Sequence, residues 1–253
     1  MNTETKNTDT NLIDRLFSVG AHFGFSKSRR HPTAKPYIFG NKQGTDIFDL
    51  EKTSELIVKA KVVLEEAGKN GHTVLFVSTK DETSPIVKEA AVDAESPYVT
   101  NRWIGGTLTN FGEIKKRIAR LSDLTSEGER GELERKYTKK ERVVIGREAE
   151  KLQFNFGGIK NMDRLPNLMV VVDPRHDAIA VQEAHDTGVP VIGIMSSDNN
   201  ASLVKYPVMV NDALQASVSL VVDELISALK AGKAAYVPKA VKSTDRRRSF
   251  RQN

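Results

Sequence analysis

Apolar positions along this chain follow two alternating patterns. Short, mostly apolar segments predict buried strands at 73–78, 98–99, 168–172, 190–195 and 206–210. Between them, apolar residues recur every three or four positions and predict helices over 51–69, 81–94, 173–187 and about 211–229. Strands that alternate with helices in this way form a parallel sheet covered on both faces. The pattern therefore predicts a doubly wound α/β fold.

The N-terminal region lacks this rhythm. Residues 1–10 are polar and are expected to be disordered, and a helix is expected to begin at Leu12, capped by Asp9 or Thr10. A basic loop without hydrophobic period occupies 20–36. Two short apolar stretches follow it, and they predict a β-hairpin with strands at 37–40 and 45–49.

A second interruption lies at 111–156. Apolar residues spaced alternately by three and four form two arms, separated by a polar stretch at 122–137. This spacing predicts an antiparallel coiled-coil hairpin with charged outer faces that reaches a partner. The alternative is two helices packed flat on the sheet.

Composition excludes several classes of protein. The chain has 253 residues, no cysteine and a net charge of +5, with a sequence pI near 9.2 and a mean hydropathy of -0.40. A disulfide scaffold and a thiolate metal site are therefore excluded. No apolar run is long enough for a membrane span, and the N-terminus lacks the form of a secretory signal. We expect a soluble, intracellular protein.

The positive charge is concentrated in two places. One cluster lies in the loop 27–35, and the other in the segment from residue 230 to the C-terminus, where eight Lys and Arg residues face the single acid Asp245. The latter is interpreted as a disordered basic arm that binds a polyanion, with a solubilising terminus as the alternative. Two basic clusters flanking a nearly neutral core favour nucleic acid as the ligand.

The sequence contains no set of motifs that would form a catalytic site. Both glycine-rich phosphate loops, G-x-G-x-x-G and G-x-x-x-x-G-K-[ST], are absent, so Lys80 is interpreted as a surface lysine. After the strand 168–172, Asp173 and His176 could serve in catalysis, but Asp173 before Pro174 is better explained as a helix cap. We expect no enzyme and no cofactor. The alternative is an enzyme acting on a phosphorylated small molecule around Asp173, His176 and Ser196.

The segment Asn-Arg-Trp-Ile-Gly-Gly-Thr-Leu-Thr-Asn at 101–110 contains the only tryptophan. Here the chain resembles the S-two protein family of the small ribosomal subunit, in its bacterial and organellar form. Further motifs match in the same order, among them Pro-Tyr-Ile-Phe-Gly at 36–40, Gly-Gly-Ile-Lys at 157–160 and Asn-Asp at 211–212.

The resemblance implies a flavodoxin-like core with a protruding helical hairpin, in a non-catalytic constituent of the small subunit at its head–body junction. Expected partners are 16S-type rRNA and neighbouring proteins, including the S-one type messenger-binding protein, with no membrane. The expected location is a cytoplasmic ribosome, or alternatively an organellar one. The domains expected are a core of 1–110 and 157–231, an inserted hairpin of 111–156 and a basic tail of 232–253.

Exposed cations and one aromatic residue are the candidate rRNA contacts. We expect phosphate contacts from the loop and hairpin, with binding directed by shape rather than by base sequence. Those in the N-terminal loop and in the tryptophan segment are Arg29, Arg30, Lys35, Arg102 and Trp103. Those on and beside the hairpin are Lys115, Lys116, Arg117, Lys139, Lys140 and Lys160.

Several positions depart from the family pattern, and they put the contacts of one loop in doubt. Phe25 replaces a histidine, and the segments 31–34, 196–198, 200–201 and 208–210 also differ. These departures suggest a divergent lineage or an organellar copy. A regulatory RNA-binding or scaffold protein outside the ribosome is the remaining alternative.

Overall fold

The structure is a computed structural model that describes residues 4–236. Its larger sheet has five parallel strands in the order β5-β4-β6-β7-β8. Their bounds are β4 Val74–Val77, β5 Tyr98–Val99, β6 Leu168–Val172, β7 Val191–Met195 and β8 Tyr206–Met209. This is the flavodoxin-like order, in which the second strand lies outside the first. The predicted strands and the doubly wound parallel sheet are confirmed.

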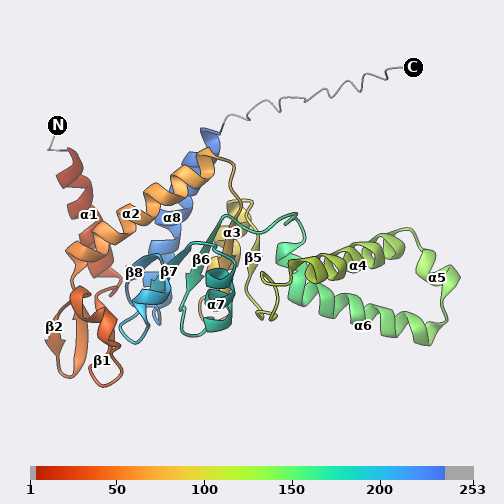
Figure 1. The fold of residues 1–253 in the computed structure, drawn as a ribbon, viewed down its shortest axis with the longest axis horizontal. Helices are drawn as coiled ribbons and strands as arrows, with labels where there is room; N and C mark the ends of the chain where they lie inside the picture. The colour runs from red at the N-terminus through yellow and green to blue at the C-terminus, as the bar shows by residue number, and fades with distance from the viewer. Residues whose placement is uncertain (1–3, 237–253) are drawn as a thin grey trace, which may run out of the picture.

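Helices cover both faces of this sheet (Figure 1). One face packs against α1 Glu4–Ser18, α2 Leu50–Lys69, α3 Ser84–Asp93 and α8 Gln215–Ala234. The other face packs against α7 Ala178–Asp186, the 103–109 loop and the root of the hairpin. Strands β6 and β7 are buried along their whole length, as expected for strands between two helical layers.

A second, three-stranded antiparallel sheet lies at the N-terminal end of the molecule. It consists of β1 Phe23–Ser26, β2 Ile38–Lys42 and β3 Thr45–Phe48 in the order β1-β3-β2. The predicted hairpin of β2 and β3 is confirmed. The basic loop is more ordered than predicted, because it contributes β1 and a short 3-10 helix, η1 Pro32–Tyr37.

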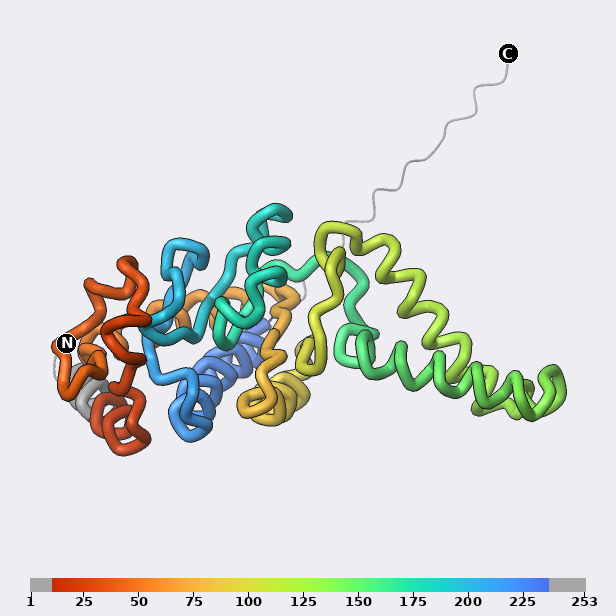
Figure 2. Tube along the Cα trace, turned by 90° about the horizontal axis from the view of Figure 1, so that it is seen from below, coloured from red at the N-terminus to blue at the C-terminus, as the bar shows by residue number. Residues whose placement is uncertain are grey.

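The inserted segment folds as two long helices with a short one between them. These are α4 Phe111–Glu129, α5 Glu132–Lys136 and α6 Lys139–Phe156. Helices α4 and α6 lie side by side and extend away from the sheet in both views (Figures 1 and 2). Buried Ile114, Leu121, Leu152 and Phe156 continue the hydrophobic cluster of the core into the space between them. A 3-10 turn, η2 Gly157–Ile159, returns the chain to the core.

Three local predictions are wrong. Helix α1 begins at Glu4, so residues 4–10 are helical rather than a disordered lead. Helix α7 begins only at Ala178, and Asp173 lies five residues earlier with φ +59°, in a turn that it caps for His176. Helix α8 runs from Gln215 to Ala234, later at both ends than predicted. The basic arm predicted at the C-terminus falls largely on 237–253, outside the described residues.

Candidate nucleic-acid interface

In the loop 27–35 two of the three predicted cations are free to bind. Arg29 and Lys35 are exposed. Arg30 instead places Nη1 3.5 Å from Oδ1 of Asp46, a carboxylate that is fully buried beneath the loop. A buried carboxylate without a countercharge is costly, so Arg30 stabilises the small sheet, while Arg29 and Lys35 face outward.

Positions that depart from the family pattern meet one another beside this loop. The amide of Phe25 donates to Oγ of Ser197 at 2.9 Å, and the amide of His31 donates to the Ser197 carbonyl at 2.8 Å. Oγ1 of Thr33 contacts Oδ1 of Asn200 at 3.4 Å. Residues about 170 positions apart in the chain therefore form one hydrogen-bonded unit, which the sequence alone did not reveal.

Trp103, one of the candidate rRNA contacts named from the sequence, has a structural role. Its side chain is buried, and Nε1 donates to Oε1 of Glu183 at 3.0 Å. The other oxygen, Oε2, accepts from the Leu108 amide at 2.9 Å and from both the amide and hydroxyl of Thr109. A ring enclosed in this way cannot stack on RNA, whereas the neighbouring Arg102 is exposed.

Glu183 organises the whole 103–109 loop from helix α7. Burial raises the pKa of its carboxyl, but hydrogen bonds from Leu108, Trp103, Gly106 and Thr109 outweigh burial and hold the pKa below its ordinary value of 4.5. An ionised carboxylate that accepts several amide hydrogens is a strong anchor. Glu183 was not identified from the sequence, because its role depends on the contact with Trp103.

On helix α4 the predicted cations differ in availability. Lys116 is 2.6 Å from Oε1 of Glu113, and Nζ of Lys115 donates to the Asp163 carbonyl at 2.7 Å. Arg117 is exposed and has no ion pair within residues 4–236. Arg120, one turn further along, pairs with Glu148 of α6 at 3.4 Å.

Helix α6 presents a row of cations on the side opposite α4. Lys140, Val144, Arg147, Lys151 and Phe154 are spaced by four and three residues and are all exposed. In the described part of the chain none of the three cations has an acidic partner. The residues that contact α4, such as Ile145 and Leu152, lie on the other side of the helix. Lys139 is also exposed and without an ion pair at the start of α6.

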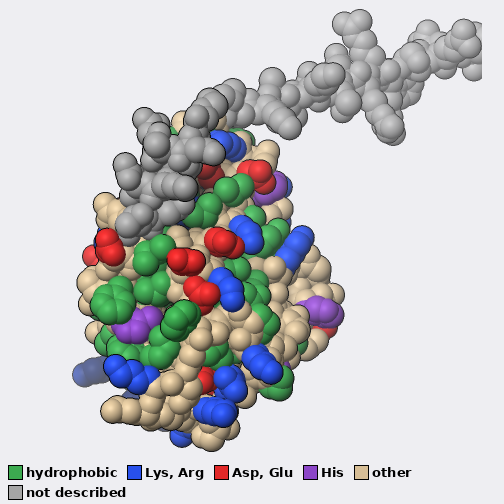
Figure 3. Space-filling view, turned by 90° about the vertical axis from the view of Figure 1, so that its left-hand side faces the viewer, with side chains coloured by type: hydrophobic (Ala, Val, Ile, Leu, Met, Phe, Trp, Pro, Cys, Tyr) green, Lys and Arg blue, Asp and Glu red, His purple; other side chains and the backbone are tan. Residues whose placement is uncertain are grey.

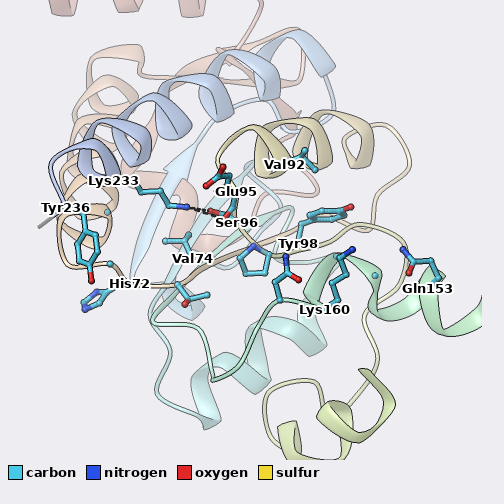
Figure 4. Close-up of a pocket in the computed structure, with 17 residues that line it drawn as sticks. His72, Val74, Val92, Glu95, Ser96, Tyr98, Gln153, Lys160, Lys233 and Tyr236 are labelled. Carbon is cyan, nitrogen blue, oxygen red and sulfur yellow. Dashed lines mark hydrogen bonds between the residues drawn. The ribbon is translucent and has the colours of Figure 1, made fainter. Parts of the chain in front are cut away.

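Lys160 belongs to a large groove at the amino-terminal edge of the sheet, with a volume of about 870 Å³. In Figure 4 its side chain points toward the ring of Tyr98, and Lys233 lies on the other wall. Nζ of Lys233 donates to the carbonyl of Ala94 at 2.5 Å and to Oγ of Ser96 at 3.2 Å. Burial lowers the pKa of Lys233, whereas the side chain of Lys160 is exposed.

The carboxyl-terminal edge of the sheet, where an enzyme of this fold would work, is occupied by internal contacts. Asp177 accepts from the amide of Thr79 at 3.0 Å and from its hydroxyl at 2.6 Å. Lys80 pairs with Asp173 at 3.4 Å and is mostly buried, so it is not the surface lysine predicted. Ser196 is buried, and no hydrogen bond in residues 4–236 links it to His176.

One carboxylate at this edge is unsatisfied. Asp212 is fully buried, and neither of its oxygens accepts a hydrogen bond of good geometry from a described residue. Burial, and secondarily the charge of Asp173, raise the pKa of Asp212 to about 7, although Lys80 and the backbone amide of Ser196 act in the opposite direction. Within residues 4–236 no group of three His, Asp or Glu side chains is arranged to hold a metal.

Comparison with known proteins decides what these surfaces belong to. The family model described as "Ribosomal protein S2" matches residues 16–232. The chain belongs to the ribosomal protein S2 family. It is 40% identical over 218 residues to "Small ribosomal subunit protein uS2" of Roseiflexus sp. (strain RS-1), covering 86% of this chain and 83% of that protein. It is 35% identical over 224 residues to "Small ribosomal subunit protein uS2c" of Emiliania huxleyi, covering 88% and 97%.

The family membership confirms the resemblance drawn from the 101–110 motif. Ribosomal protein S2 is a structural, non-enzymatic constituent of the small ribosomal subunit and works in translation. The enzyme alternative and the scaffold outside the ribosome are therefore set aside. Among residues 4–236 no helix has the length and apolar character to cross a membrane.

Proposed function

We propose that this chain bridges two segments of small-subunit rRNA at the junction of head and body, holding one at each end of an elongated molecule. The loop with Arg29 and Lys35 lies beside β1 and β2, and helix α6 lies at the opposite end (Figure 1). Separated contacts of this kind fix the distance between two RNA segments, which suits a structural constituent.

The observation that carries this proposal is the outward row of Lys140, Arg147 and Lys151 on α6. Cations that already have an acidic partner gain little from a phosphate, whereas unpaired ones gain the full effect of counterion release. At a rise of 1.5 Å per residue, Lys140 and Lys151 are about 16 Å apart along the helix. The row therefore suits the backbone of one RNA helix, read by shape.

Arg117, Lys139 and Arg102 extend the proposed surface, because they are exposed and unpaired in the described part of the chain. Lys115 and Lys116 contribute less, since each already has an oxygen partner. Trp103 is not part of the proposed rRNA-contacting surface, because its side chain is buried.

We also propose the S-one type messenger-binding protein as a neighbour. An exposed apolar cluster at the N-terminal end supports a protein partner there, because contiguous exposed apolar side chains often mark protein–protein contact sites. Phe17 stacks on His22 with ring centroids 4.6 Å apart, Phe23 lies beside His22, and Leu214 borders the cluster. Figure 3 shows this end, where hydrophobic side chains gather and are bordered by both basic and acidic side chains.

The test is the salt dependence of binding to transcribed small-subunit rRNA. The triple variant Lys140→Gln, Arg147→Gln, Lys151→Gln removes the proposed α6 row. We expect its plot of log affinity against log salt, between about 50 and 200 mM, to lose about 2 to 3 in slope.

A matched control removes the same charges from cations that are already paired. Lys69, Arg130 and Lys136 pair with Glu65 and Glu132, so their replacement by Gln should change the slope by less than about 1. Equal losses in the two triple variants would mean that only net charge matters, and the proposed surface would be wrong.

A further inference from the structure

A small hollow opens where the helical hairpin joins the core, beside the edge strand β5. Its volume is about 210 Å³. The residues that line it come from α3, from β5 and the segment after it, from the end of α6 and from η2. They are Lys88, Tyr98, Val99, Thr100, Asn101, Gln153, Phe154, Asn155, Gly157 and Gly158.

Three side-chain amides give the hollow its chemistry. Nδ2 of Asn101 donates to the Phe154 carbonyl at 2.7 Å, which orients this amide and leaves Oδ1 available as an acceptor. Gln153 folds over Gly157, where a Cβ would lie 2.9 Å from its Cδ. Asn155 supplies the third amide. Each amide offers both donors and an acceptor, the combination that reads the edge of a nucleobase.

An aromatic surface lies at the rim of the same hollow. The side chain of Phe154 is 58% exposed, and no aromatic ring within residues 4–236 stacks on it. The exposed ring of Phe154 lies at the end of the α6 row, about one turn beyond Lys151. Stacking on aromatic side chains is a common way for proteins to hold unpaired RNA bases.

Lys88 is the one charged residue among those that line the hollow. On α6, Lys151 and Glu150 both lie about one turn before Phe154. Neither lysine has an acidic partner in the described part of the chain. A lining without carboxylates suits an anionic strand and does not suit a basic peptide.

We propose that this hollow, which we call the root pocket, receives one unpaired rRNA nucleotide. Its base stacks on Phe154, its edge is read by Asn101, Gln153 and Asn155, and its flanking phosphates contact Lys88 and Lys151. The proposal rests on the proposed rRNA binding and deepens it, because it adds one base-reading contact to a surface that otherwise reads phosphates.

The strand has a continuous path away from the root pocket. The larger groove of Figure 4 shares Tyr98, Gln153, Gly157 and Gly158 with it. A strand that leaves on this side passes Lys160, and one that leaves on the other side follows the α6 row.

The first experiment places a photoreactive phenylalanine analogue, p-azidophenylalanine, at position 154 in the full chain. Small subunits that contain it are purified and irradiated, and crosslinks are mapped by primer extension and by mass spectrometry. We expect a crosslink to a single rRNA nucleotide that is unpaired in the subunit. A crosslink to a protein neighbour, to paired nucleotides only, or to nothing would overturn the root pocket. The same analogue at Phe39, 81% exposed at the opposite end, should not give that nucleotide.

The second experiment measures affinity for the rRNA transcript with variants that should all fold, because Phe154 is largely exposed. Phe154→Ala should weaken binding about tenfold, and Phe154→Tyr, which keeps the ring, should stay within about twofold. Asn101→Asp should also weaken binding, since it replaces an amide by a negative charge. Thermal unfolding of each variant checks the fold.

The two proposals fail in distinguishable ways. If the chain does not sediment with small subunits, or the α6 triple variant keeps its salt slope, the proposed rRNA interface fails. If it sediments with them and Phe154→Ala binds as well as the parent chain, only the root pocket fails.

Discussion

Helices α2 and α6 have similar lengths, 20 and 18 residues, but they are buried to very different extents. Helix α2 buries seven residues, among them Ile57, Leu64 and Gly68, because it lies between the sheet, α1 and α8. Helix α6 buries only Leu152 and Phe156, since it packs mainly on α4. The core therefore gains its stability from burial, and the hairpin leaves most of its surface available for a partner.

Local interactions compensate for the small burial of the hairpin. Thr138 caps α6 in a capping box with Glu141, whose side chain accepts from the Thr138 amide at 2.8 Å. Lys136 pairs with Glu132 one turn away at 2.5 Å. Such contacts stabilise the ends of the hairpin helices without burying apolar surface. Because α2 is buried and α6 is not, we expect substitutions in the core to alter the free energy of unfolding. We expect substitutions on the hairpin to alter rRNA binding.

The largest effect is expected where α2 and α8 touch through their backbones. A Cβ at Gly232 would clash with the Glu65 carbonyl, so Gly232→Ala should lower the free energy of unfolding by about 3 kcal/mol or more. The matched control is Gly146→Ala on α6, where a Cβ would meet nothing within 4 Å. It should stabilise by about 0.5 kcal/mol. Denaturant unfolding measures the free energy of unfolding of both variants. If the two substitutions changed it by similar amounts, the proposed contrast between the core and the hairpin would be wrong.

The next effect concerns the unsatisfied Asp212 of the core. Its pKa is about 7 in the folded chain against an ordinary 3.8. The folded state therefore holds the proton more tightly, and this stabilisation is complete below the unfolded pKa and lost as the pH rises through about 7. Asp212→Asn cannot ionise, so it should be more stable than the parent by roughly 2 to 4 kcal/mol at pH 8.

Near pH 4 the gain from Asp212→Asn should vanish, because Asp212 is then protonated in the folded chain. Unfolding free energies at the two pH values measure this. A gain that is the same at both would show that Asp212 does not titrate between them. Ser217→Ala, another buried side chain of the core without a hydrogen-bond partner in the described residues, serves as a control that should show no such pH dependence.

A smaller loss is expected at Glu183, which joins the core to the loop before the hairpin. Glu183→Gln keeps the shape but places an NH₂ group among donors, and should cost about 2 kcal/mol. Since the folded pKa of Glu183 lies below 4.5, its stabilisation is present above that pH and is lost as the pH falls through the folded pKa. The loss of unfolding free energy at acid pH should therefore be smaller in Glu183→Gln than in the parent chain.

Trp103, the single tryptophan of the chain, reports this loop directly. Its fluorescence should shift to longer wavelength in Glu183→Gln, because the indole loses its partner and gains water. Unchanged fluorescence together with unchanged stability would show that Glu183 does not anchor the loop.

The smallest effect is expected at the hairpin cap. Thr138→Ala removes the capping box of α6 and should cost about 1 kcal/mol locally. We expect weaker rRNA binding through Lys139 and Lys140, with little change in the unfolding of the core. Amide hydrogen exchange of the first turn of α6 measures the local effect. Thr125→Ala on α4, whose hydroxyl bonds only to the Leu121 carbonyl within its own helix, is the control and should leave that turn unchanged.

The spacing of apolar residues predicted the five strands and most helices, because burial on both faces leaves a continuous apolar run such as 168–172. Element ends were less predictable. Asp173 before Pro174 has the composition of a helix cap. Its carboxylate instead pairs with Lys80, three residues after the end of β4, and caps an isolated turn. The start of α1 was missed because residues 4–10 carry no apolar period.

For the candidate interface, the sequence identified the cations but not which of them are available. Arg29 and Arg30 are adjacent and chemically identical, yet only Arg30 is paired with the buried Asp46. Arg117 and Lys116 are likewise adjacent, and only Lys116 has an ion pair. Phe154 carried no signal as a binding residue, because an apolar residue near the end of an amphipathic helix is usually part of the core.

The sequence by itself determined the fold class and the family, since each depends on periodicity or on contiguous motifs such as 101–110. Only the tertiary structure showed that Trp103 is buried and hydrogen-bonded to Glu183, and that Arg30 forms an ion pair with Asp46. It also showed that Asn101 contacts Phe154 at the root pocket. The physical reason is that availability depends on burial and on partners. The chain brings those partners from positions 16 to 80 residues away, and no local pattern records them.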